Sequence, residues 1–291
     1  MVSKKILVPL DGSKVAEVAL PYARLIAKMY GSELILITIC APKCDDRSKH
    51  LCRAYLDLQA IELEPQGIKT SSTVIQGSIA ENITDFSINN KIDLIVVASR
   101  GYSGFKRFTM GSVTQKVIFN TFIPVIIVKP SATEVSEVGL TKILLPLDGS
   151  MFSEASIPYV EDLARVGGAE IIMLTISEPP EIPSDRSPAI KPTWEEYRDA
   201  LLQEVEQQGT AYLERVNAIF KEKGIKVKTR FVMGKVAESI IRVSEEEEVD
   251  LIAMTTHGHT GVSRWIYGNV TRRIVDESPR PVLIIHPDPS K

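Results

Sequence analysis

The sequence predicts two consecutive α/β domains, each built around an open sheet of parallel strands with helices on both faces. Three observations lead to this prediction: a motif near the N-terminus returns at domain spacing, short β-branched runs alternate with segments of helical period, and several of these runs are apolar on both faces. At 291 residues, the chain is long enough for two domains that each bury a core.

Recurring motifs define the two copies. The segment VPLDGS at 8–13 returns as LPLDGS at 145–150, an offset of 137 residues. Further along, GSIAENI at 77–83 returns as GKVAESI at 234–240, an offset of 157 residues. The second copy therefore holds about twenty extra residues between these two motifs.

The copies also end alike, which indicates where each domain closes. PVIIVKP at 124–130 corresponds to PVLIIHP at 281–287, and the polar stretch near 131–139 lies between the copies. We therefore expect domains at 1–133 and 140–291.

The first copy alternates strands with helices. Five strands are expected, near 5–10, 33–40, 69–75, 93–98 and 125–128. In the first gap, apolar residues recur at three- and four-residue spacing from Val15 to Met29, which predicts one amphipathic helix that Gly31 ends. Copy two follows the same order, so both copies read as consecutive βαβ units.

The extra residues of copy two fall between its second strand and second helix. Residues 178–192 contain five prolines, which predicts an irregular loop. A capping-box pattern, Thr193 to Glu196, then starts a long helix. The loop is either a surface insertion or a lid over the site of copy two, because loops after strand ends overhang the ligand crevice of such sheets.

Charge and cysteine usage limit the class of protein. The net charge of −3 indicates no overall attraction to nucleic acid or anionic membranes, and no apolar run approaches the roughly 18 residues of a spanning helix. We expect a cytoplasmic protein. The three cysteines, Cys40, Cys44 and Cys52, do not resemble a secreted disulfide framework; buried thiols and a redox or metal role both remain open. The acidic run at 245–248 is interpreted as a solvated face.

Two aspartates stand where the first strand of each copy ends. Asp11 and Asp148 both precede Gly-Ser, at the carboxyl edge of the predicted sheet, where open α/β sheets bind ligands. A carboxylate there can accept hydrogen bonds from an adenine amino group or a ribose hydroxyl. The alternative is a turn that only caps the following helix.

A spaced glycine pattern follows the fourth strand of each copy. In copy one, Ala98-Ser99-Arg100-Gly101 is followed by nine residues and then Gly111-Ser112 at a helix start. In copy two, Thr255-Thr256-His257-Gly258 is followed by nine residues and then Gly268-Asn269. A glycine at a helix entrance lets a phosphate approach the first-turn amides. The same spacing in both copies predicts a phosphate site in each.

Basic side chains accompany these loops. They can neutralise phosphates, although a solvated surface role is favoured for Lys106, Arg107 and Arg264. The full set is Arg100, Lys106 and Arg107 in copy one, and His257, His259 and Arg264 in copy two. The two imidazoles lack further His or Cys nearby, so they make a poor metal site.

With these motifs, the chain resembles a tandem member of the universal stress protein family over nearly its whole length. The hallmark of that family is Gly-x-x-Gly, nine residues, Gly and then Ser or Thr. Here Ala98 and Thr255 replace the first glycine, and Asn269 replaces the final Ser or Thr. The other motif positions, Gly101, Gly111, Ser112, Gly258 and Gly268, match.

The resemblance implies a fold and a ligand. It implies a Rossmann-like sheet of order 3-2-1-4-5 in each copy, similar to the adenine nucleotide alpha hydrolases, and bound ATP with Mg²⁺ held through the phosphates. It also implies that Pro9 and Ile39 frame adenine in copy one, and that Pro146 and Ile176 do so in copy two. Domains of this family commonly dimerise through the final strand. The resemblance therefore implies that the final strands, which begin at Val125 and Val282, pair with each other, and that the chain forms a homodimer or further oligomer.

We therefore expect a stress-response protein that binds ATP, acts on an unknown protein client and has no dedicated catalytic machinery. The sequence lacks both a Gly-x-x-x-x-Gly-Lys-Ser/Thr phosphate loop and the kinase signatures. Two alternatives stay open: a nucleotide-independent scaffold with one or both pockets degenerate, and a slow ATP hydrolase that works by positioning alone.

Overall fold

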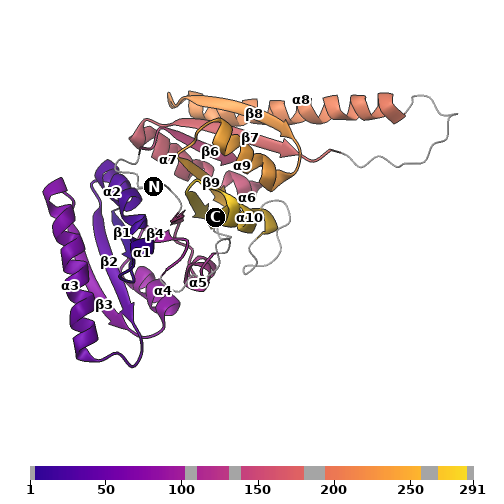
Figure 1. Ribbon diagram of the computed structural model, residues 1–291. Coiled ribbons are helices and arrows are strands. Elements are labelled where there is room, and N and C mark those ends of the chain that lie inside the picture. Colours follow the sequence, from indigo (N-terminus) through magenta and orange to yellow (C-terminus); the bar gives the residue numbers. More distant parts are fainter. Residues whose placement is uncertain (1–3, 102–109, 131–138, 180–193, 257–267, 287–291) are drawn as a thin grey trace.

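The computed structural model describes residues 4–101, 110–130, 139–179, 194–256 and 268–286. Strands and helices alternate along both copies, as the sequence predicts (Figure 1). The strands of copy one are β1 (Lys5–Pro9), β2 (Glu33–Cys40), β3 (Thr70–Gln76), β4 (Leu94–Ala98) and β5 (Val125–Val128). Its helices are α1 (Lys14–Glu17), α2 (Ala19–Tyr30), α3 (Asp46–Leu63), α4 (Ile79–Asn89) and α5 (Ser112–Asn120), with a short 3₁₀ turn at Glu64–Gln66.

Copy two repeats this order. Its strands are β6 (Lys142–Pro146), β7 (Glu170–Ser177), β8 (Val227–Met233), β9 (Leu251–Thr255) and β10 (Val282–Ile285). Its helices are α6 (Met151–Glu154), α7 (Ile157–Gly167), α8 (Trp194–Lys221), α9 (Val236–Glu246) and α10 (Asn269–Glu277). No helix in the described ranges is long and apolar enough to cross a membrane.

The strands of both copies form one continuous sheet. Its order is β3-β2-β1-β4-β5-β10-β9-β6-β7-β8, so each copy has the order 3-2-1-4-5 that the family resemblance implies. Pairing within each copy is parallel, whereas β5 and β10 pair antiparallel, with Ile127 opposite Val282 and Val125 opposite Ile284. The predicted pairing of the final strands is therefore confirmed, and the two copies are joined as an internal pseudo-dimer.

Successive strand residues enter two different cores, because side chains alternate between the faces of a sheet. Ile6 and Val8 belong to the core on one face, and Leu7 belongs to the core on the other. Helices α2, α3, α7 and α8 contribute buried residues to the first core, and α4, α5, α9 and α10 contribute to the second. This double cover explains the continuous apolar runs in the sequence.

The predicted single first helix is divided in both copies. In copy one, α1 ends at Glu17 and α2 begins at Ala19; in copy two, α6 ends at Glu154 and α7 begins at Ile157. Each break lies four residues before a proline, Pro21 or Pro158. Proline has no N–H for the carbonyl four residues earlier, and its ring clashes with that carbonyl. The expected stop at Gly31 is confirmed, since that glycine is left-handed, with φ 64°.

The second helix of copy two, α8, has 28 residues, against 18 in its counterpart α3. It begins at Trp194, which matches the long helix that the sequence predicts there. The proline-containing loop and Thr193 lie outside the described residues.

The acidic run at 245–248 is not uniformly solvated, so that expectation was wrong for one residue. Glu247 is buried, and its carboxylate is paired with Lys228 at 2.7 Å and also with Arg230. Hydrogen bonds from these two side chains of β8, the one from Lys228 foremost, hold the pKa of Glu247 below its usual range despite burial.

The three cysteines are free and gather around the end of β2. The Sγ atoms of Cys40 and Cys52 lie 3.3 Å apart, and Cys40 is buried. Burial foremost, together with the neighbouring thiols, raises the pKa of Cys40 to about 12. Cys40 is thus a protonated core thiol at neutral pH.

Candidate functional site

The end of β1 forms a hydrogen-bonded turn around Asp11. Its Oδ1 accepts hydrogen bonds from the Ser13 amide at 3.0 Å and the Ser13 hydroxyl at 2.6 Å. Ser13 in turn caps α1 by accepting from the Ala16 amide at 3.2 Å. Gly12 supplies the left-handed conformation of the turn, with φ 82°. One carboxylate oxygen therefore serves the capping turn that the sequence offered as an alternative.

Copy two repeats the turn with the same chemistry. Asp148 Oδ1 accepts from the Ser150 amide at 3.0 Å and the Ser150 hydroxyl at 2.6 Å. Ser150 then accepts from the Ser153 amide at 3.1 Å and caps α6. Both aspartates are exposed at the carboxyl edge of the sheet.

The other oxygen of Asp11 faces the loop after β4. A Cβ atom added to Gly101 would lie only 2.4 Å from Asp11 Oδ2, a distance that real Cβ contacts do not reach. The structure thus brings together a residue that follows β1 and a residue that follows β4, 90 positions apart in the sequence. β1 and β4 are neighbours in the sheet, and the topological switch lies between them.

The residues expected to frame adenine lie at the ends of neighbouring strands. Pro9 is the last residue of β1, and Ile39 lies near the end of β2, which pairs with β1. Pro146 and Ile176 have the same places on β6 and β7. All four are partly buried, so each keeps exposed surface at this edge.

The entrance of α5 is built for close backbone approach. Ala98 ends β4, and the Gly111 amide then donates to the Ser99 carbonyl at 2.8 Å before α5 begins at Ser112. A Cβ on Gly111 would lie 3.3 Å from that carbonyl oxygen, so the position is tight for any larger residue. No side chain in the described part of the chain caps this helix. Its first-turn N–H groups have no intrahelical partners, because they lie at the start of the helix.

Copy two builds the same entrance. Thr255 ends β9, the Gly268 amide donates to the Thr256 carbonyl at 3.3 Å, and α10 begins at Asn269. A Cβ on Gly268 would again lie 3.3 Å from that carbonyl oxygen. Several residues expected at or beside the loops lie outside the described residues: Lys106, Arg107, His257, Gly258, His259 and Arg264.

One contact between the copies reaches this region and was not predicted. Asp276 of α10 accepts a 2.8 Å hydrogen bond from the Met110 amide, next to the α5 entrance, through its carboxylate. Its backbone carbonyl accepts a 2.6 Å bond from Lys129 Nζ. One sequence difference between the copies accompanies this contact. Lys129 follows the final strand of copy one, whereas His286 follows the final strand of copy two.

The pKa of Lys129 is lowered to about 8, mainly because the ammonium group is half-buried; the positive charge of Arg100 also lowers it, whereas the charge of Asp276 opposes the shift. We expect amine acylation, followed residue by residue by mass spectrometry from pH 6 to 11, to give Lys129 a midpoint near pH 8. Arg100→Ala should raise that midpoint, because it removes a like charge. A midpoint near 10.4, the ordinary lysine value, in the folded protein would contradict this prediction.

Comparison with known proteins agrees with this architecture. The model of the universal stress protein family matches residues 3–129 and 139–286. A universal stress protein of Mycolicibacterium smegmatis is 23% identical over 97% of both chains, and one of Methanocaldococcus jannaschii is 27% identical over 50% of this chain and 93% of its own. The crystal structure of a universal stress protein from Archaeoglobus fulgidus superposes with a TM-score of 0.74, at 22% identity over 99% of this chain and 98% of that one.

Proposed function

The chain belongs to the universal stress protein family, and from that premise we propose that it binds one ATP in each copy and acts as a cytoplasmic stress-response regulator. The observation that carries the proposal is the packing of Gly101 against the Asp11 carboxylate at the switch between β1 and β4. In this contact Asp11, the acid that would bind adenine or ribose, lies against the loop that leads to α5. The N-terminus of α5 has no side-chain cap.

Adenine and ribose are assigned to the strand ends. In copy one, Asp11 Oδ2 would accept from the nucleoside, while Oδ1 stays committed to the Ser13 turn. Pro9 and Ile39 would supply apolar contact to the adenine ring. The counterparts in copy two are Asp148, Pro146 and Ile176.

The phosphates are assigned to the helix entrances. In copy one, Gly101 and Gly111 allow the backbone to approach closely, and Ser112 would donate a further hydrogen bond; Ala98 and Arg100 flank them. In copy two, the corresponding residues are Thr255, His257, Gly258, Gly268 and Asn269. These donors fit a polyphosphate, and Mg²⁺, held through the phosphate oxygens, would neutralise part of its charge.

We propose no dedicated catalytic role for either site. The described residues at the switch supply hydrogen-bond donors and one carboxylate, and the chain has no transferring lysine of a phosphate-loop type. A slow ATP hydrolase is the alternative, and multiple turnover that Asp11→Ala abolishes without loss of binding would favour it. The domains would extend over 1–133 and 140–291 and act on a protein client.

Calorimetry on nucleotide-free protein with ATP and Mg²⁺ tests the proposal directly. We expect two binding sites, one lost in Gly111→Val and the other in Gly268→Val, because each added side chain would crowd a carbonyl already 3.3 Å from the Cβ position. Gly139→Val is the matched control, since its Cβ would meet only Thr141 Cγ2, at 3.8 Å. Near-ultraviolet circular dichroism checks that each variant is folded.

The outcomes separate the hypotheses. Two sites, each lost with its own variant, would support ATP binding in both copies. One site that only Gly111→Val removes would make copy two a degenerate partner. No binding to the folded wild-type protein would reject the proposal and favour the nucleotide-independent scaffold.

A further inference from the structure

The outer face of α3 carries apolar side chains that the fold does not bury. Leu51, Leu58 and Ile61 are 65%, 62% and 59% exposed, and the exposed Ala54 lies between them. Their spacing of three, four and three residues places all four on one side of the helix. The opposite side holds the α3 residues that pack on the sheet, Leu56 and Leu63, which are buried. We call Leu51, Ala54, Leu58 and Ile61 the outer stripe.

Copy two shows that a helix in this place does not require such a stripe. An offset of 157 residues aligns β3 with β8 and also the two helices before them, so that Leu56 and Leu63 correspond to the buried Leu213 and Phe220. The same offset replaces the outer stripe by Gln208, Ala211, Arg215 and Ala218. The inner faces of α3 and α8 are therefore alike, whereas the apolar outer face belongs to copy one alone.

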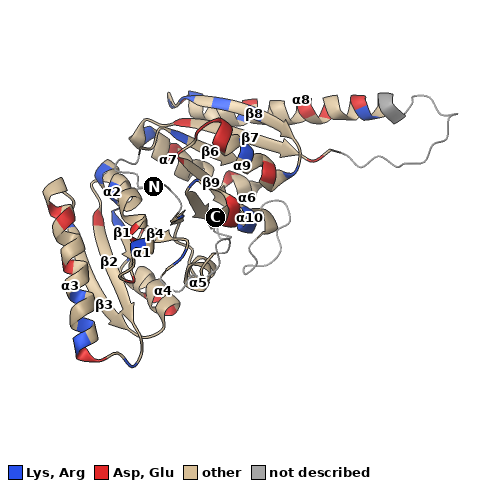
Figure 2. Cartoon of the chain, viewed as in Figure 1, with Lys and Arg blue, Asp and Glu red and all other residues tan. Residues whose placement is uncertain are grey.

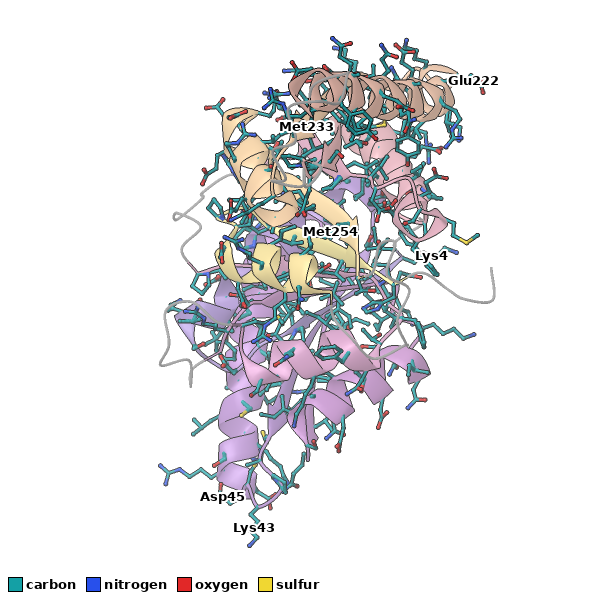
Figure 3. The ribbon with its side chains drawn as sticks, turned by 90° about the vertical axis from the view of Figure 1, so that its right-hand side faces the viewer. Lys4, Lys43, Asp45, Glu222, Met233 and Met254 are labelled. Atoms are coloured by element: carbon teal, nitrogen blue, oxygen red, sulfur yellow. The ribbon has the colours of Figure 1, made fainter. Side chains whose placement is uncertain are left out.

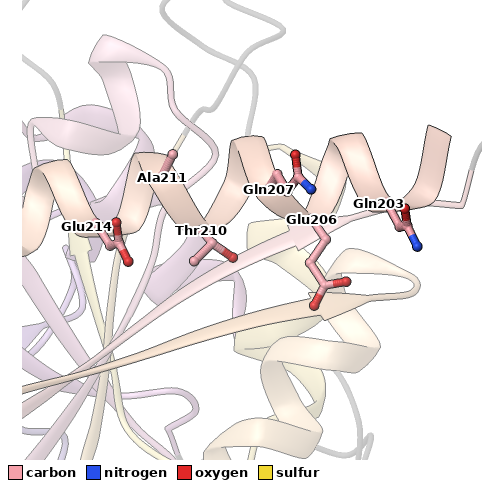
Figure 4. Close-up of a pocket in the computed structure, with 6 residues that line it drawn as sticks. All are labelled: Gln203, Glu206, Gln207, Thr210, Ala211 and Glu214. Carbon is pink, nitrogen blue, oxygen red and sulfur yellow. The ribbon is translucent and has the colours of Figure 1, made fainter. Parts of the chain in front are cut away.

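The outer face of α8 is polar over a wider area as well. A hollow of about 400 Å³ on it is lined by Gln203, Glu206, Gln207, Thr210, Ala211 and Glu214 (Figure 4). These side chains are exposed and carry acidic and amide groups. An apolar partner that fits α3 would therefore not fit α8.

The charges of α3 are divided between its two ends. Its first half carries the basic residues Arg47, Lys49 and Arg53, with Asp45 and Asp46 at the tip. The charged residues of the second half are all acidic. Figure 2 shows blue segments along the first half of the helix and red ones along the second. The tip itself projects from the molecule: Lys43 and Asp45 lie at the extreme end of the domain (Figure 3). The acidic residues of the second half, counted to the turn that follows, are Asp57, Glu62 and Glu64.

We propose that the outer stripe binds the outer stripe of a second copy of this chain, with the two α3 helices antiparallel about a two-fold axis. Leu51 of one chain then lies opposite the partner's Ile61, and Ala54 lies opposite the partner's Leu58. Arg47, which lies four residues before Leu51 on the same side of the helix, then lies near the partner's Glu64. Lys49 and Arg53 are engaged within their own chain, by Asp46 at 3.3 Å and by the Ser72 carbonyl at 2.9 Å. A parallel pairing would instead place like charges together, so the charge pattern selects the antiparallel one.

Several features make a second copy the fitting occupant. A two-fold interface needs one patch that is complementary to itself, and an apolar stripe with opposite charges at its two ends meets that need. The final strands β5 and β10 already pair inside the chain, so those edges are not available to a second chain. An α3 of 18 residues is about 27 Å long. One such helix pair is a small interface, so we expect a weak dimer, with a dissociation constant of about micromolar or higher.

Sedimentation velocity on nucleotide-free full-length protein over a range of concentrations tests the proposal independently of any nucleotide. We expect a monomer–dimer equilibrium, and we expect Leu58→Arg to weaken it at least about tenfold, because a charged group would be buried against apolar side chains. Arginine is the residue that α8 carries at the corresponding position, Arg215, so the change suits an exposed helix surface. Ile88→Arg on α4 is the matched control, since Ile88 is 63% exposed, and it should leave the equilibrium unchanged.

A charge exchange tests the antiparallel arrangement. Arg47→Glu alone and Glu64→Arg alone should each weaken the dimer, because each places like charges together. The double variant should restore it, since the partner's charges are exchanged as well. Arg47 and Glu64 are both exposed, and neither forms an ion pair within the described part of the chain, so we expect both changes to leave the monomer folded.

The contrary results are equally definite. A wild-type chain that stays monomeric at hundreds of micromolar would overturn the proposal. A dimer unaffected by Leu58→Arg, or weakened as much by Ile88→Arg, would place the interface elsewhere. Failure of the double charge variant to restore a dimer that both single variants weaken would reject the antiparallel arrangement.

Discussion

Gly101→Ala is expected to weaken ATP binding strongly in copy one while leaving copy two unchanged. The added methyl group would lie 2.4 Å from Asp11 Oδ2, so the carboxylate must move away from the switch. A hydrogen bond to a charged group contributes about 1.5–3 kcal/mol, which corresponds to a loss of affinity of about tenfold to a hundredfold. Calorimetry should show a weakened site in copy one beside a copy-two site of unchanged affinity.

A double-mutant cycle decides whether the carboxylate is the cause. Asp11→Ala should remove the same hydrogen bond, and Gly101→Ala should then have little further effect, because no Oδ2 atom remains to be displaced. Gly139→Ala is the control, since its Cβ would meet only Thr141 Cγ2, at 3.8 Å. Additive losses in the Asp11 and Gly101 variants would show that Gly101 acts through phosphate approach and not through Asp11.

Patterns that are local in the sequence predicted most of the fold. The repeated motifs at domain spacing identified two copies, and the strand positions in copy one followed from β-branched runs to within about a residue at each end. The pairing of β5 with β10 followed from the family resemblance, whereas its antiparallel direction was not predicted. The division of the first helix was missed, although Pro21 and Pro158 stood inside the predicted helix. Apolar periodicity favours one continuous helix there, whereas the missing proline N–H interrupts its hydrogen bonds.

The candidate site was predicted where its chemistry lies in motifs and missed where it depends on distant contacts. The turns at Asp11 and the entrance at Gly111 recur in both copies, so spacing alone revealed them. The contact between Lys129 and α10 joins residues 147 positions apart, and no local pattern encodes it. The burial of Glu247 has the same origin, because its partners lie on β8.

Phe220→Ala is expected to produce the largest loss of stability among these variants. Phe220 is fully buried near the end of α8, in the core beneath β7 and β8, and it corresponds to Leu63 of copy one. Truncation of a buried phenylalanine costs about 3–5 kcal/mol, because it removes apolar contacts and leaves a cavity. Both tryptophans, Trp194 and Trp265, belong to copy two. Urea unfolding followed by tryptophan fluorescence therefore measures the affected half, and its midpoint should fall by roughly 1–3 M.

The neighbouring residue supplies the matched control for this prediction. Ile219 lies one position earlier on α8 and is 41% exposed, so Ile219→Ala removes a similar apolar side chain without opening a cavity. We expect it to cost less than about 1 kcal/mol. Circular dichroism also resolves whether copy one unfolds with copy two, since the β5–β10 pair joins the two sheets. A coincident shift in both signals would show that this strand pair transmits the loss of packing beneath α8 to copy one, whereas a shift in fluorescence alone would show that the copies unfold independently.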